Sequence, residues 1–151
     1  MKNKLTLIIS LFVVMLTMSI VTSAQVNRPY HDGSVWDIAF IKVKPGQGAA
    51  YMNYLATDWK RNQEAMKKAG LILSYMVVST EAHGANDWNL MLMTEFKDLA
   101  SMEAGQDKAD QLMQTLVGDD AKASKAMVTR GEMRELMGDR LARQIILEPK
   151  K

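Results

Sequence analysis

Two segments of the chain repeat one pattern, and this repeat constrains the fold more than any other feature. Residues 36–41 and 88–93 each begin with Trp, continue with a short polar residue and an aliphatic one, and stay apolar afterwards. Each segment begins a strand-like run, and a helical run comes after it. A β-α-β unit used twice is typical of this arrangement. The sequence therefore predicts an α+β domain.

The first 24 residues have the pattern of a signal peptide. Lys2 and Lys4 give a basic start, residues 5–20 are mostly apolar, and Ala24 closes a segment of small residues. The apolar run is about 16 residues long, whereas a membrane span needs roughly 20. We expect cleavage before Gln25 and an exported protein, periplasmic or secreted, without a stable membrane anchor.

Charge and cysteine content restrict the partners of the exported chain. Without Lys2 and Lys4, 17 basic residues stand beside 17 acidic ones, and this balance does not favour nucleic acid as a partner. The chain has no cysteine, which excludes disulfides, thiolate metal ligands, a Cys nucleophile and a lipid anchor on cysteine. The remaining residues suffice for one packed domain. We expect a flexible leader at 25–34 and a domain at 35–148.

Alternation, helical spacing and turn residues divide the domain into elements. Gly70 and Asp98 have the positions of a helix C-terminal and N-terminal cap, and Thr129 with Glu132 has capping-box spacing. In the first helix, a three-and-four spacing puts Met52, Leu55 and Trp59 on the core side and leaves Tyr51 and Tyr54 off it. The expected elements are strands at 35–44, 71–78, 88–96 and 141–147, helices at 49–69 and 99–117, and one or two short helices between 118 and 138.

These elements resemble the dimeric α/β-barrel superfamily over residues 35–148. The resemblance rests on a strand ending in Lys44-Pro45-Gly46, an amphipathic helix, and a third strand that leads into a helix at Asp98. It implies a ferredoxin-like β-α-β-β-α-(α)-β order with an antiparallel four-stranded sheet, and a homodimer whose sheets close a barrel. Because the superfamily includes monooxygenases, haem-degrading enzymes, ligand sensors and stress-induced proteins, the fold leaves the activity open.

A candidate binding site follows from strand alternation. By analogy with Phe96, we assign the tryptophan face of the sheet to the helices, and the opposite face to the barrel lumen. That lumen is mainly apolar with few polar groups, which suits a small hydrophobic or aromatic ligand. The candidate ligand-binding residues are Asp37, Asn89, Met91, Met93 and Glu95.

The sequence contains no visible catalytic constellation. His31 and His83 lie in polar, turn-like segments, so we predict no metal and no cofactor. Three functions stay open. The first is a binding or stress-related protein with a small hydrophobic ligand. The second is a cofactor-free monooxygenase with Glu95 or Asp37 as the proton acceptor, its pKa raised by burial. The third is an assembly protein without a ligand.

Overall fold

The computed structural model describes residues 28–149, so the predicted signal peptide at 1–24 lies outside the described residues. One antiparallel sheet is formed by β1 (Tyr30–Val43), β2 (Ser74–Ser79), β3 (Leu90–Phe96) and β4 (Arg134–Leu147), in the order β2-β3-β1-β4. With helices between β1 and β2 and between β3 and β4, this order is the ferredoxin-like one. The predicted fold class is confirmed.

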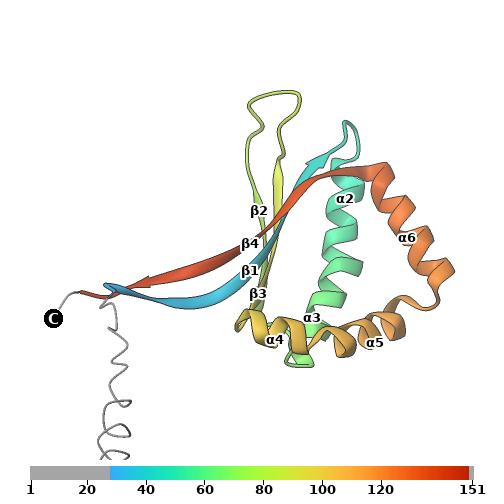
Figure 1. The fold of residues 1–151 in the computed structure, drawn as a ribbon. Helices are drawn as coiled ribbons and strands as arrows, with labels where there is room; N and C mark the ends of the chain where they lie inside the picture. The colour runs from blue at the N-terminus through green and yellow to red at the C-terminus, as the bar shows by residue number, and fades with distance from the viewer. Residues whose placement is uncertain (1–27, 150–151) are drawn as a thin grey trace, which may run out of the picture.

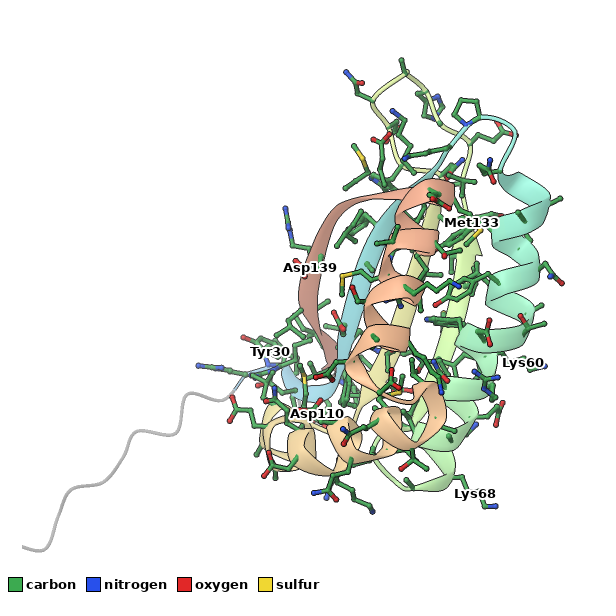
Figure 2. The ribbon with its side chains drawn as sticks, turned by 90° about the vertical axis from the view of Figure 1, so that its right-hand side faces the viewer. Tyr30, Lys60, Lys68, Asp110, Met133 and Asp139 are labelled. Atoms are coloured by element: carbon green, nitrogen blue, oxygen red, sulfur yellow. The ribbon has the colours of Figure 1, made fainter. Side chains whose placement is uncertain are left out.

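The helices lie together on one side of the sheet and leave its other face open (Figure 1). A helical segment after β1 consists of α2 (Gly48–Tyr54), η1 (Leu55–Trp59) and α3 (Lys60–Lys68). After β3 come α4 (Leu99–Ala104), α5 (Gln106–Val117) and α6 (Asp120–Met133). Figure 2 looks onto this helical layer, with α6 in front of the sheet and α3 beside it.

The first helical segment contains a π-helical turn, and this turn changes which residues face the core. The Lys60 N–H donates to the Leu55 carbonyl, five residues back. Because the turn holds one extra residue, the inward face before it is displaced by one position. Tyr51 is fully buried, whereas Met52 is 50% exposed. The prediction that Met52 faces the core and Tyr51 does not is wrong.

The core lies between the inward side of this helical segment and the centre of the sheet. Ile41 of β1, Leu90 of β3, Tyr51 and Leu55 form its buried cluster. Half-buried apolar side chains surround it: Ala39, Val43, Trp59, Leu92 and Met133. The predicted C-cap is confirmed, since Gly70 has φ +72° and the Leu71 N–H donates to the Met66 carbonyl.

The second helical region begins at the predicted cap and differs from the prediction in two later places. The predicted cap is confirmed, because the Asp98 carboxylate accepts from the Ser101 N–H at 2.6 Å. The single helix expected at 99–117 is interrupted at Gly105, where a Cβ would lie 3.0 Å from the Leu71 side chain. α6 is capped by Asp119, whose carboxylate accepts from the Lys122 N–H, rather than by Thr129.

β1 and β4 are both longer than predicted. Tyr30 pairs with Leu147, so β1 begins within the segment expected as a flexible leader at 25–34, and not at Val35. Residues 134–138, expected to be helical, form the start of β4, where Leu136 pairs with Ile41. Pairing with β1 across a bulge decides their conformation. No helix among residues 28–149 is long and apolar enough to cross a bilayer.

Candidate functional site

The register between β1 and β3 decides which residues share a face of the sheet. Residues directly opposite each other in an antiparallel pair point to the same side. Ile41 lies opposite Leu90, and both belong to the buried core under the helices. One position along, Phe40 lies opposite Met91, on the uncovered side. The open face carries Trp36, Ile38 and Phe40 of β1 and Met91, Met93 and Glu95 of β3.

The predicted site residues therefore do not share one face. Met91, Met93 and Glu95 lie on the open face. Asp37 lies opposite Thr94 on the helix-covered side, and the Asn89 side-chain oxygen accepts from the Val43 N–H at 3.0 Å. The predicted assignment of the two faces is confirmed for β3, whose Leu90 and Leu92 lie under the helices, and is wrong for β1, because the register puts Trp36 on the open face. That these five residues contact a ligand stays a prediction.

The two carboxylates considered as proton acceptors have different surroundings. The Ser74 hydroxyl donates to the Glu95 carboxylate at 2.5 Å across β2 and β3. Burial raises the pKa of Asp37, and the nearby Asp139 carboxylate raises it further. Neither Asp37 nor Glu95 lines the groove described next. Among residues 28–149, no three His, Asp or Glu side chains gather closely enough to hold a metal ion.

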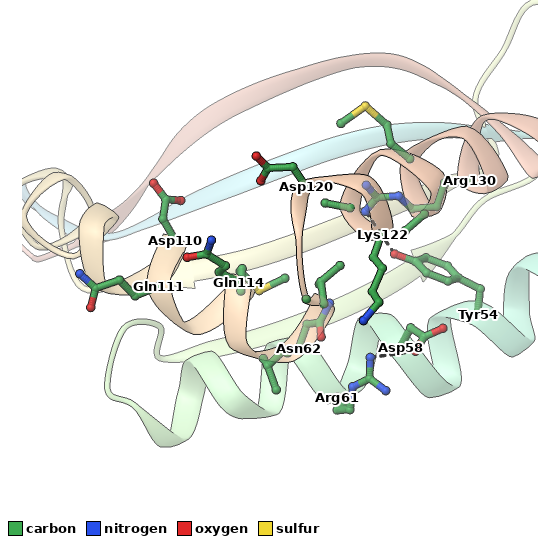
Figure 3. A pocket seen from close by; sticks show the side chains of 17 residues that line it. Tyr54, Asp58, Arg61, Asn62, Asp110, Gln111, Gln114, Asp120, Lys122 and Arg130 are labelled. Carbon is green, nitrogen blue, oxygen red and sulfur yellow. Dashed lines mark hydrogen bonds and ion pairs between the residues drawn. The ribbon is translucent and has the colours of Figure 1, made fainter.

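A groove lies on the helical side, between the η1–α3 segment and the α5–α6 pair (Figure 3). Its volume is about 630 Å³, within the range of small-molecule sites. A smaller cavity of about 250 Å³ adjoins it and shares Tyr54, Asp58 and Arg130 with it. The groove's apolar lining residues are Met113, Leu116, Val117, Ala123, Ala126 and Met127.

Polar groups are distributed unevenly along the groove. Nη1 of Arg130 donates to the Tyr54 hydroxyl oxygen at 3.3 Å. Arg61 forms an ion pair with Asp58 at 2.9 Å. Figure 3 shows Tyr54 and Arg130 at one end of the groove and Asp110 at the other. One end of the groove is therefore rich in hydrogen-bond donors.

Tyr51 lies behind this donor-rich end, stacked on Tyr54 with ring centroids 5.9 Å apart. Its hydroxyl is buried without a hydrogen-bond partner, as are the Nε atoms of Arg130 and Arg134. Burial raises the pKa of Tyr51 to about 12; Arg134 and Arg130 oppose this shift, while Tyr54 adds to it. The Tyr51 hydroxyl therefore keeps its proton at neutral pH.

Sequence reasoning did not bring Tyr51, Tyr54, Arg130 and Arg134 together. It placed Tyr51 on the solvent side and Arg134 in a helix, because neither the π-helical turn nor the start of β4 has a local signal. Only the close spacing of Tyr51 with Tyr54 and of Arg130 with Arg134 marked them as possible neighbours.

Comparisons with known proteins were made for sequence and for structure. No protein-family model matches the chain, and no curated protein matches it. The solved structures that resemble it include three at low sequence identity. HapK from Hahella chejuensis has 12% identity and a TM-score of 0.47, covering 73% of this chain and 91% of that one. A NipSnap family protein of unknown function from Agrobacterium tumefaciens strain C58 has 13% identity and a TM-score of 0.48, covering 78% and 92%.

The third is a dimeric protein of unknown function with a ferredoxin-like fold from Bacteroides fragilis NCTC 9343. It has 18% identity and a TM-score of 0.40, covering 74% of this chain and 95% of that one. These likenesses concern the fold only. The strand order β2-β3-β1-β4 by itself defines the chain as a ferredoxin-like α+β protein.

Proposed function

We propose that the protein is an exported homodimer that binds a small hydrophobic or aromatic molecule. The groove of about 630 Å³ carries this proposal. Its lining combines six apolar residues with polar and charged side chains, and small-molecule sites use such polar groups to orient an apolar ligand. The groove lies between the η1–α3 segment and the α5–α6 pair, and not on the open face of the sheet. We therefore place the ligand in this groove rather than in the predicted barrel lumen. Each subunit then has its own site.

Binding of a neutral aromatic probe tests this assignment. N-phenylnaphthylamine fluoresces when it enters an apolar site, and we expect saturable binding by the wild type. Ala126 lines both cavities, so Ala126→Trp fills the groove and weakens binding at least about tenfold. Ala100 is exposed on α4, outside the groove, and Ala100→Trp is the matched control. Unchanged binding by Ala126→Trp would contradict the groove as the site.

The open face of the sheet supports the homodimer. Trp36, Ile38, Phe40, Met91 and Met93 form an apolar surface on which none of the helices of residues 28–149 packs. Contiguous apolar patches of this kind mark interaction sites, and a second copy of the same face covers both at once. Light scattering of the exported protein should give twice the subunit mass. A particle of single-subunit mass at micromolar concentration would contradict the proposed homodimer.

Export is supported by the pattern of the first 24 residues. N-terminal sequencing of protein recovered outside the cytoplasm should begin at Gln25 or close to it. Full-length chain in washed membranes would show instead that the segment anchors the protein.

A further inference from the structure

The junction of α6 and β4 carries two arginines without counter-ions. Arg130 lies in the last turn of α6, and Arg134 is the first residue of β4. Among residues 28–149, Arg61 and Arg143 each pair with an aspartate, whereas neither Arg130 nor Arg134 has a carboxylate within 4.0 Å. The Nε atoms of both are buried and donate to no acceptor. A buried N–H of a charged group without an acceptor is unfavourable, and a bound anion relieves it.

Two tyrosine hydroxyls add donors at the same place. Tyr51 is 0% exposed and its hydroxyl has no partner. The Tyr54 oxygen accepts from Arg130, so its own proton is left to donate elsewhere. The cluster of Tyr51, Tyr54, Arg130 and Arg134 is thus rich in donors and lacks a charged acceptor. Guanidinium and hydroxyl donors together match the oxygens of a carboxylate or sulfonate.

Two members of the cluster, Tyr54 and Arg130, close one end of the groove, whereas Tyr51 and Arg134 do not line it. Tyr54 and Arg130 line both cavities, and Lys122 adds a further positive charge to the same lining. Of the three lining carboxylates, Asp58 is paired with Arg61, and Asp110 lies at the opposite end of the groove (Figure 3). Asp120 lies at the start of α6, about 15 Å from Arg130 at 1.5 Å per helical residue. The negative charges therefore do not cancel the positive end.

We propose that this end of the groove is an anion subsite, and that the ligand is an amphipathic acid. Its apolar body lies along Leu116, Ala123 and Met127, and its acidic group accepts hydrogen bonds from Arg130 and Tyr54. This inference rests on the proposed function, because it names the chemical class of the ligand of the same groove.

Two probes with closely similar aromatic bodies test the subsite. Anilinonaphthalene sulfonate carries an anionic group, and N-phenylnaphthylamine is its neutral counterpart. We expect the wild type to bind the sulfonate at least about tenfold more tightly. Arg130→Gln should remove this preference and leave the affinity for the neutral probe within about twofold. Arg143→Gln, which changes an arginine that is paired with Asp32 on the sheet and lies outside the groove, is the matched control and should keep the preference.

The outcomes separate the inference from the proposed function. Equal affinity of the wild type for the two probes would overturn the subsite, and this comparison needs no variant to fold. A parallel loss of both probes in a folded Arg130→Gln would overturn it as well. Failure of the neutral probe to bind at all would overturn the groove as a ligand site.

Discussion

Replacing Tyr51 with Phe should stabilise the ligand-free protein, although most changes in a core destabilise it. The Tyr51 side chain is fully buried and its hydroxyl has no hydrogen-bond partner. Burying an unsatisfied polar group costs about 1–3 kcal/mol. Phenylalanine keeps the ring, its packing and its stacking on Tyr54, and removes only the hydroxyl. We expect the free energy of unfolding to rise by about 1–2 kcal/mol.

Urea denaturation followed by fluorescence measures this change, with a rise in the thermal midpoint of about 4 °C as a second readout. Tyr54→Phe is the matched control. It removes the hydroxyl that accepts from Arg130, so it should destabilise the protein by about 1 kcal/mol. If Tyr51→Phe instead lowered the free energy of unfolding by 1 kcal/mol or more, the Tyr51 hydroxyl would have a good partner. The argument that this cluster awaits an acceptor would then be refuted.

Three further predictions concern the sheet. Met93 lies mid-face, opposite Ile38, so Met93→Lys should place a charge in the dimer interface at a cost of several kcal/mol, and light scattering should show monomers or aggregates. The pKa of Asp37 is raised in the folded state, so ionisation of its carboxyl group at neutral pH opposes folding. Asp37→Asn should therefore raise the thermal midpoint of unfolding at pH 7. This gain should vanish below pH 3.8, the ordinary pKa of the group. Ile41→Ala should cost about 2–5 kcal/mol in urea unfolding, while Val77→Ala, at a 38% exposed position, should cost clearly less.

The type and order of the main elements could be predicted from the sequence, because local signals specify them. Gly70 ends the first helical segment and Asp98 begins the second, and both caps depend only on neighbouring backbone groups. The strands were recognisable as apolar runs, although their ends were not. β4 was predicted too short because the capping-box spacing of Thr129 with Glu132 and the helical spacing of Met133, Leu136 and Met137 indicated a helix there. Only pairing with β1 makes residues 134–138 a strand.

The faces of the sheet could not be predicted in the same way. β1 is apolar on both sides around Phe40 and Ile41, so its alternation does not mark one side as buried. The register with β3 decides the matter, and it depends on contacts far apart in sequence. The residues of the predicted site were grouped by an assumed register. Tyr51 was missed for a separate reason, because the π-helical turn that brings it inward has no local signal in the sequence.

The pairing of β1 with β4 sets the time at which this protein can fold. β1 is an inner strand, held by β3 on one side and by β4 on the other, yet Tyr30 pairs with Leu147, almost the whole domain later. Until β4 is available, one edge of β1 has no partner and a loop on the order of 100 residues has to close. Long-range antiparallel pairing of this kind is slow. Under the export that we propose, the chain therefore completes its sheet only after its last strand has crossed the membrane.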